Sequence, residues 1–158
     1  MPGILFVCTA NICRSPMAEG MFKKFLADRD EAGEWRVESA GTWGFDAEPA
    51  ALGSQTVMSE MGIDISNHSA RRVNFDILSS FDLILTMESG HKEALQVEFP
   101  EISDRVYMLS EMTHEQKDIP DPIGGPIAEY ETTAQLIEQY LLNGYEEIRI
   151  LAGSAKQD

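Results

Sequence analysis

The chain has 158 residues, 43% of them hydrophobic and 25% charged, which is ordinary for a globular protein large enough to bury a core. Twelve Lys and Arg residues against 27 Asp and Glu residues give a net charge of −15. Such a surface repels polyanions, so we expect neither nucleic acid nor an anionic membrane as a partner. The N-terminus has no basic segment and only a short apolar run, so we expect no signal peptide and no membrane span.

The N-terminal segment predicts a strand, a short loop and a helix. Ile4–Cys8 is a continuous apolar run, as in a strand that is buried on both faces. Ser15 is suited to cap the helix that follows, and Pro16 is suited to its first helical position. Apolar residues then recur at helical spacing and form one face of the helix: Met17, Met21, Phe22, Phe25 and Leu26.

The middle of the chain alternates between strands and helices in the same way. Trp35–Ser39 predicts a second strand, and residues 48–61 predict a second helix that Gly62 is placed to end. Phe81–Met87 predicts another buried strand, which is followed by a helix over residues 89–99. This alternation is typical of units in which a helix connects two parallel strands.

The C-terminal third predicts a last strand, a long loop and a closing helix. Arg105–Leu109 is the strand, and the loop runs to Pro126. Apolar residues recur at helical spacing from Ile127 onward, and Asn143-Gly144 is a candidate interruption of this helix. We interpret the apolar stripe as core packing, because the sheet needs a helix to cover it.

These elements predict an α/β fold in a single domain over residues 1–158, with a four-stranded, mainly parallel sheet and helices on both faces. The sequence contains no linker, internal repeat or low-complexity segment. In such sheets ligands bind beyond the carboxyl ends of the strands, and Cys8 is the last residue of the first predicted strand. We therefore expect a reactive group at this position.

The loop CTANICR, between the first strand and its helix, is suited to bind a phosphate. Its backbone N–H groups and the helix N-terminus can surround an anion and stabilise the Cys8 thiolate. Arg14 supplies a planar cation that matches two phosphate oxygens, and Ser15 can donate a hydrogen bond to the thiolate. Asn11 tolerates the left-handed backbone that a sharp bend needs.

Other interpretations of the two cysteines, Cys8 and Cys13, explain less. A metal site needs more ligands, and the three histidines are scattered along the chain at positions 68, 91 and 114. A structural disulfide or two inert thiols would leave Arg14 and the helix start unexplained. Two cysteines spaced in this way suit a reducing compartment, so we predict a cytoplasmic protein that uses no metal and no cofactor.

A motif near the N-terminus resembles the signature of the low-molecular-weight protein tyrosine phosphatases: Cys8, five further residues, then Arg14, Ser15 and Pro16. Its position after the first strand of a chain of this length makes the resemblance specific. The resemblance continues through three later segments, and so it spans nearly the whole chain: Ser39–Thr42, His68–Arg71 and Asp121-Pro122.

The resemblance implies hydrolysis of a phosphomonoester through a phosphocysteine intermediate. Cys8 would be the nucleophile, Arg14 would hold the phosphoryl oxygens, and Asp121 would protonate the leaving oxygen and then activate water. Asp118 is the rival acid in the same loop. The phosphate would be bound by the whole loop after the first strand: Thr9, Ala10, Asn11, Ile12, Cys13, Arg14 and Ser15.

The resemblance also implies roles for residues that support the loop. Asn11 would hydrogen-bond to Ser39 and His68 and so hold the loop open, and Arg71 would brace the fold through a carboxylate. Two interpretations of Cys13 stay open. It is either a second thiol that traps an oxidised Cys8 as a disulfide, or a small buried hydrophobic residue.

The sequence specifies the substrate less closely than the reaction. By position, Ile12, Trp43, Phe45 and Ile123 would form the walls of a substrate slot. Ile12 offers apolar contact that suits a phenyl ring and favours phosphotyrosine. Gly124-Gly125 resembles the late loop of a subgroup that hydrolyses phosphoarginine on proteins, and so it favours the other substrate.

We predict a protein tyrosine phosphatase that acts as a monomer on phosphorylated protein substrates. A protein arginine phosphatase of the same family is the alternative. An arsenate reductase would need a cysteine pair far along the chain, and no cysteine follows Cys13. A non-catalytic phosphate-binding module would have lost the nucleophile, the arginine or the acid, and all three are present.

Overall fold

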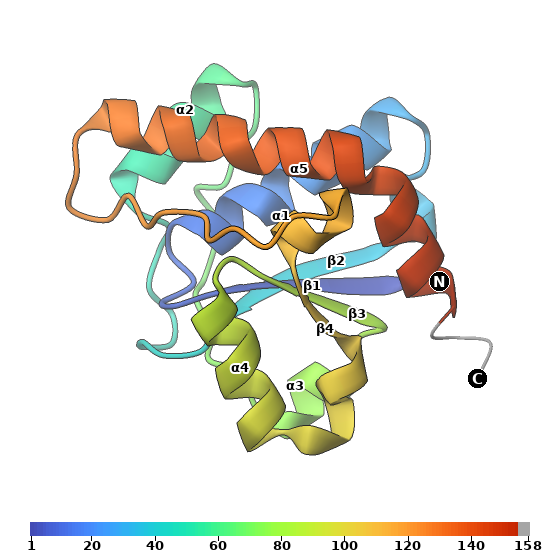
Figure 1. The fold of residues 1–158 in the computed structure, drawn as a ribbon. Coiled ribbons are helices and arrows are strands. Elements are labelled where there is room, and N and C mark those ends of the chain that lie inside the picture. Colours follow the sequence, from blue (N-terminus) through green and yellow to red (C-terminus); the bar gives the residue numbers. More distant parts are fainter. Residues whose placement is uncertain (155–158) are drawn as a thin grey trace.

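The computed structural model describes residues 1–154, and the strands within this range form one parallel sheet (Figure 1). Its order is β2-β1-β3-β4, from the strands β1 (Gly3–Cys8), β2 (Arg36–Gly41), β3 (Leu83–Thr86) and β4 (Val106–Met108). The chain winds from β1 to one side and then returns to the other side of β1. In such sheets a ligand site forms at this reversal, beyond the carboxyl ends of the strands.

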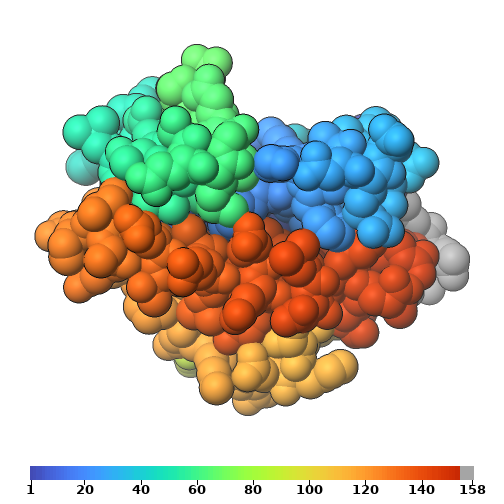
Figure 2. Space-filling model, turned by 90° about the horizontal axis from the view of Figure 1, so that it is seen from above, coloured from blue at the N-terminus to red at the C-terminus, as the bar shows by residue number. Residues whose placement is uncertain are grey.

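Helices cover both faces of the sheet, so the predicted fold class is confirmed. Figure 1 shows α1 (Arg14–Asp28), α2 (Leu52–Glu60) and α5 (Ile127–Ser154) on one face, and α3 (Phe75–Ser79) and α4 (Ser89–Glu98) on the other. Figure 2 shows α5, in orange to red, running along the first face beside α2 and the N-terminal segments. Among the helices of residues 1–154, none combines the length and the hydropathy that crossing a membrane requires.

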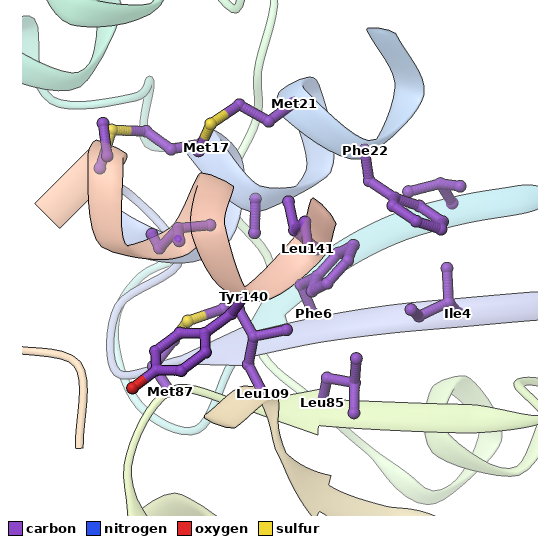
Figure 3. Packing of buried hydrophobic residues seen from close by; sticks show 14 of the residues in the cluster. Ile4, Phe6, Met17, Met21, Phe22, Leu85, Met87, Leu109, Tyr140 and Leu141 are labelled. Carbon is purple, nitrogen blue, oxygen red and sulfur yellow. The ribbon is translucent and has the colours of Figure 1, made fainter. Parts of the chain in front are cut away.

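The side chains of β1 alternate between two cores, because successive residues of a strand point to opposite faces. Ile4, Phe6 and Cys8 face α1 and α5, whereas the residues between them face α3 and α4. Figure 3 shows the first of these cores, in which the rings of Phe6 and Phe22 meet edge to face at a centroid distance of 5.8 Å. Burial on both faces fixes β1, and so it fixes where Cys8 leaves the sheet.

The start of α1 differs from the prediction. The helix begins at Arg14 with Cys13 at the cap position, and no described side chain caps it. Ser15 is therefore not the N-cap. It lies in the first turn, and its hydroxyl instead lies within hydrogen-bond distance of Cys8 and Asn11. In this first turn the amide of Ser15 also donates to the sulfur of Cys8, at 3.4 Å.

The second helix begins at Leu52 rather than at residue 48. Pro49 disfavours helical backbone at the residue before it, which delays the helix. The amide of Ala51 instead donates to the carbonyl of Ile12 at 2.8 Å, so the segment before α2 lies against the loop after β1. Gly62 follows the end of α2 as predicted, with a left-handed φ of +78°.

The last helix, α5, is continuous through Asn143-Gly144, so the candidate interruption is wrong. Gly144 serves packing instead, because a Cβ at this position would lie 2.6 Å from the Cβ of Met112. Met112 belongs to η3 (Leu109–Thr113), a short 3-10 helix in the segment that was predicted as a loop. The glycine therefore allows α5 to approach the backbone of this segment.

Besides η3, three more short helical elements have no counterpart in the predictions: α3, η1 (Ala32–Glu34) and η2 (Pro100–Arg105). Elements of three to six residues complete too few turns to show a helical period. The cap of α3 is visible in the sequence only in retrospect. The side chain of Asn74 accepts a hydrogen bond from the amide of Ile77 at 2.8 Å.

Candidate active site

The loop from Cys8 to Arg14, which we call the phosphate loop, turns its carbonyl groups outward. Four of them accept hydrogen bonds from groups outside the loop: Cys8 from the Thr42 amide (2.9 Å), Thr9 from the Trp43 amide (2.8 Å), Asn11 from His68 Nε2 (2.6 Å) and Ile12 from the Ala51 amide (2.8 Å). In a trans peptide the N–H points away from the C=O. The N–H groups that follow these carbonyls therefore point into the loop, where they can surround an anion.

Asn11 holds the bend of the phosphate loop, as predicted. Its φ of 60° lies in the left-handed region that Asn tolerates. Its side-chain Nδ2 donates to Ser15 Oγ at 2.7 Å and to Ser39 Oγ at 3.0 Å, and its Oδ1 accepts from the amide of Arg71 at 3.0 Å. Together with the bond from His68, these contacts tie the bend to three separate segments of the chain.

Two supporting carboxylates are visible only in the structure. Glu19 accepts a hydrogen bond from the hydroxyl of Ser39 at 2.6 Å, which orients the oxygen that Asn11 contacts. Glu38 accepts one from Arg71 at 2.6 Å, which confirms that Arg71 braces the fold through a carboxylate. Neither residue belongs to a sequence motif, so no pattern signalled it.

The sulfur of Cys8 faces two hydrogen-bond donors. The amide of Ser15 donates to Sγ at 3.4 Å, and Ser15 Oγ lies 3.0 Å from Sγ. Because Ser15 Oγ already accepts from Asn11, its proton is free to be donated to the sulfur. Both donors are placed to stabilise a charged sulfur, which is what a nucleophilic thiolate or a thiolate leaving group requires.

Arg14 lies beneath the loop, with only 1% of its surface exposed. Its Nη1 donates to Glu88 Oε2 at 2.6 Å and to the carbonyl of Ile119 at 2.7 Å. Its Nη2 lies 3.3 Å from Thr9 Oγ1 and 3.5 Å from Asp121 Oδ2. Within residues 1–153, its Nε is the only buried side-chain nitrogen or oxygen that lacks a hydrogen-bond partner. The edge formed by Nε and Nη2 thus suits two oxygens of a phosphoryl group.

The two candidate acids, Asp121 and Asp118, have different surroundings. Asp121 is about one-third exposed, with Oδ2 beside Arg14 and Oδ1 accepting from the amide of Ile123 at 3.1 Å. Asp118 accepts from the amide of Ser89 at 2.8 Å and so stabilises the start of α4. The structure therefore places Asp121, and not Asp118, within contact distance of the arginine.

Glu88 and His91 belong to the site, although no motif pointed to them. His91 Nε2 lies 2.9 Å from Thr9 Oγ1, and its Nδ1 accepts from the amide of Glu88 at 3.2 Å. Burial, and after it the positive charge of Arg14, hold the pKa of His91 below its usual value. The spacing of Glu88 and His91 at the start of a predicted helix is a capping pattern, and it is the one signal that would have found them.

Cys13 lies behind the phosphate loop. Its Sγ is 3.9 Å from the hydroxyl of Tyr130, and its carbonyl accepts from the hydroxyl of Ser54 at 3.3 Å. Burial raises the pKa of Cys13 to about 11 and that of Tyr130 to about 12. Cys8 and Cys13 are both free thiols. The Cys13 thiol is thus protonated at neutral pH and is a much weaker nucleophile than a thiolate.

The predicted substrate walls come from three segments: the phosphate loop (Ile12), the segment after β2 (Trp43 and Phe45) and the segment after Asp121 (Ile123). Ile12 is half-buried, whereas Trp43, Phe45 and Ile123 are exposed, Phe45 most of all at 80%. The segment after β2 lies against the phosphate loop, because a Cβ on Gly44 would be only 3.1 Å from the backbone of Ala10. The guanidinium of Arg72 covers the ring of Trp43 at 5.0 Å from its centroid. Apolar side chains are therefore available beside the loop to contact a substrate.

Comparison with known proteins agrees with this geometry. The family model described as low molecular weight phosphotyrosine protein phosphatase matches residues 3–150. The chain is 36% identical over 136 residues to a probable low molecular weight protein-tyrosine-phosphatase EpsP of Ralstonia nicotianae, covering 86% of this chain and 88% of that protein. It is 35% identical over 156 residues to a protein-arginine-phosphatase of Bacillus subtilis, covering 98% and 97%.

A solved structure shows the same fold. The low molecular weight protein tyrosine phosphatase from T. tengcongensis superposes with a TM-score of 0.87 at 34% identity. The superposition covers 93% of this chain and 99% of that chain.

Proposed function

Because the chain belongs to the low molecular weight phosphotyrosine protein phosphatase family, we propose that it hydrolyses phosphotyrosine on proteins through a phosphocysteine intermediate at Cys8. The observation that carries the proposal is the chain of hydrogen bonds from Asn11 through Ser15 to the sulfur of Cys8. An inert buried cysteine has no need of two donors. A sulfur that must carry charge before attack and again on leaving does need them.

In the first step the Cys8 thiolate attacks phosphorus in line with the leaving oxygen. The S–P bond forms as the P–O bond breaks, while the loop amides and Arg14 hold the other phosphoryl oxygens. Asp121 gives its proton to the leaving oxygen. Its position beside Nη2 of Arg14 supports this role, since the same guanidinium edge faces the phosphoryl group.

In the second step water attacks phosphorus and releases inorganic phosphate. Asp121, now ionised, accepts a proton from that water, and the S–P bond breaks. The Ser15 hydroxyl stabilises the departing thiolate. The positive charge comes from Arg14 and the backbone amides, and so this scheme uses no cofactor. A protein of this kind would act in the cytoplasm, as a monomer, on phosphorylated proteins.

Phosphoarginine is the second candidate substrate. The Bacillus subtilis relative named protein-arginine-phosphatase matches 98% of this chain, and Gly124-Gly125 follows the acid here. Gly124 has a φ of +79°, a conformation that a side chain other than Asn or Asp rarely adopts. Against this candidate stands Ile12, whose half-buried apolar side chain suits a phenyl ring better than a guanidinium.

The test is a comparison of hydrolysis of one peptide sequence carrying either phosphotyrosine or phosphoarginine, with Cys8→Ser as the blank. We expect faster release of phosphate from the phosphotyrosine peptide. Faster release from the phosphoarginine peptide would transfer the assignment to the second candidate. If Cys8→Ser binds phosphate and the wild type hydrolyses neither peptide, the protein would instead be a non-catalytic phosphate-binding module.

A further inference from the structure

The hydroxyl of Thr9 lies where two buried side chains from different elements converge on the phosphate loop. His91 Nε2, from α4, is 2.9 Å from Thr9 Oγ1, and Arg14 Nη2, from α1, is 3.3 Å from it. His91 is 7% exposed and Arg14 is 1% exposed, so these contacts are shielded from solvent. Nothing in the proposed chemistry uses this side chain, since it assigns only the backbone of Thr9 to phosphate binding.

The hydrogen bonds decide where the protons of this network lie. The amide of Glu88 can only donate, so Nδ1 of His91 must accept and carries no proton. The neutral ring then has its proton on Nε2 and donates it to Thr9 Oγ1. Arg14 also can only donate, so Thr9 Oγ1 accepts twice. Both of its lone pairs are occupied, and its own proton must point to a third oxygen.

We infer that the Thr9 hydroxyl donates this proton to a phosphoryl oxygen held by Arg14, and that His91 is the positioning residue that orients it. The inference rests on the proposed phosphatase function. Nη2 of Arg14 lies beside Thr9 on the edge that suits a phosphoryl group, so an oxygen bound to Nη2 comes within reach of the hydroxyl. The side chain of Thr9 thus adds one donor to those of the loop backbone.

The neutral state of His91 is built into the start of α4. Glu88 and His91 form a reciprocal cap, in which each side chain accepts from the backbone N–H of the other residue. The groups that face the imidazole are Arg14, whose charge opposes protonation, and Glu88, Asp118 and Asp121, whose charges favour it. A protonated ring would turn an N–H toward the amide of Glu88 and break the cap. Acid should therefore disorient Thr9 through His91.

The first experiment removes the hydroxyl without changing the shape of the side chain. Thr9→Val should weaken competitive inhibition by inorganic phosphate about tenfold and lower kcat/KM for para-nitrophenyl phosphate at least as much. Thr9→Ser restores the hydroxyl and should recover most of both losses. Equal losses in Thr9→Val and Thr9→Ser would overturn the inference, because a purely structural role follows the missing methyl and not the hydroxyl.

The second experiment separates the two nitrogens of His91. His91→Gln can place an N–H near the position of Nε2, and His91→Asn can place an acceptor near Nδ1 but no donor toward Thr9. We expect His91→Asn to weaken phosphate inhibition several-fold and His91→Gln to recover most of that loss. In a double variant with Thr9→Val, the His91→Asn change should weaken phosphate inhibition no further than Thr9→Val does alone. If the fold-losses in phosphate inhibition of the two single variants multiply in the double variant, His91 does not act through Thr9.

The pH dependence of activity distinguishes the positioning role of His91 from a purely structural one, because a purely structural role would not change the pH profile. As pH falls through the lowered pKa of His91, below the ordinary imidazole value of about 6.5, the activity of His91→Gln relative to wild type should rise, since glutamine has no proton to gain. His114→Asn is the matched control, because His114 is exposed and asparagine tolerates its left-handed φ of 64°. It should leave the profile unchanged. A profile of His91→Gln that parallels wild type would argue against His91 as the titrating group.

The outcomes also separate this inference from the proposed function. A wild type that hydrolyses no aryl phosphate would reject the proposed function, and calorimetric binding of inorganic phosphate to Thr9→Val and wild type would still test Thr9. A Thr9→Val variant that loses kcat but binds phosphate as wild type does would overturn the inference. In that case the hydroxyl would serve Asp121 rather than the phosphoryl group.

Discussion

The phosphate loop and the acid loop (residues 118–125) meet at one site but are built in opposite ways. In the phosphate loop, Asn11 and Arg14 are almost fully buried and are held by several hydrogen bonds. In the acid loop, Asp121 is about one-third exposed and Ile123 about half exposed. Under the proposed function, the first loop would hold the oxyanion that all phosphomonoesters share. The second loop would contact the part of the substrate that varies and would admit water.

This difference indicates how substitutions should behave. A change in the phosphate loop disturbs chemistry and folding together, because the same buried hydrogen bonds serve both. A change in the acid loop or in the exposed walls should alter rate or specificity and leave the free energy of unfolding nearly unchanged.

The largest effect is expected at Arg14. Arg14→Lys keeps the charge but loses the planar fork, so kcat/KM for phosphotyrosine should fall by about 10³-fold. Steady-state kinetics with a phosphotyrosine peptide measure this loss, and Arg149→Lys, an exposed position on α5, is the control. A loss smaller than tenfold would mean that the guanidinium geometry does not matter. It would also contradict the stated difference between the phosphate loop and the acid loop.

Asp121 tests the acid loop. Asp121→Asn should lower turnover of phosphotyrosine by roughly 10²–10³-fold, because the leaving oxygen no longer receives a proton. The loss should be smaller with para-nitrophenyl phosphate, because its nitrophenolate leaving group is a weaker base and depends less on protonation. The free energy of unfolding of Asp121→Asn, measured by urea denaturation, should stay within about 0.5 kcal/mol of the wild-type value.

Asp118→Asn is the matched control for Asp121→Asn, since it changes the same functional group three positions earlier. It should alter turnover little, because Asp118 contacts the start of α4 and not Arg14. If Asp118→Asn is the slower of the two variants, the assignment of the acid moves to Asp118.

Asn11 tests whether the phosphate loop is also a folding element. Asn11→Ala should lower the free energy of unfolding by about 2–4 kcal/mol, since buried partners lose their bonds and alanine must adopt a φ of 60°. Asn11→Gly should lose roughly 1 kcal/mol less, because glycine adopts that φ without strain. Urea denaturation is the measurement. A loss no larger than that of Asn143→Ala, an exposed helical asparagine, would count against this role.

The smallest effect is expected at the exposed wall. Phe45→Ala should raise KM for a phosphotyrosine peptide about two- to tenfold, the range of one lost aromatic contact. Turnover and stability should hardly change, because Phe45 is 80% exposed. Phe75→Ala, a half-exposed aromatic residue on the other face of the sheet, is the control. Equal KM values for wild type and Phe45→Ala would remove Phe45 from the substrate site.

The positions of the strands and the phosphate loop could be predicted from the sequence because they rest on local patterns. A continuous apolar run followed by Cys8, Arg14 and a helix start describes one contiguous segment, and its geometry follows from backbone rules. The support by Asn11, Ser39 and His68 was expected from the family resemblance, and the structure confirms the contacts. The short helices were missed, because a few residues carry no period.

Only the tertiary structure decided which distant groups surround this segment. Glu88 and His91 reach the loop because β3 lies beside β1, a pairing between residues about eighty positions apart that no local pattern encodes. The Asp121-Pro122 resemblance had already favoured Asp121 over Asp118 as the acid, and the fold adds that Asp121 lies beside Arg14 whereas Asp118 contacts the start of α4. Ser15 appeared to be a helix cap until the fold placed the sulfur of Cys8 beside it. Local sequence thus determines the loop between β1 and α1, whereas strand order determines which charged and proton-donating groups face that loop.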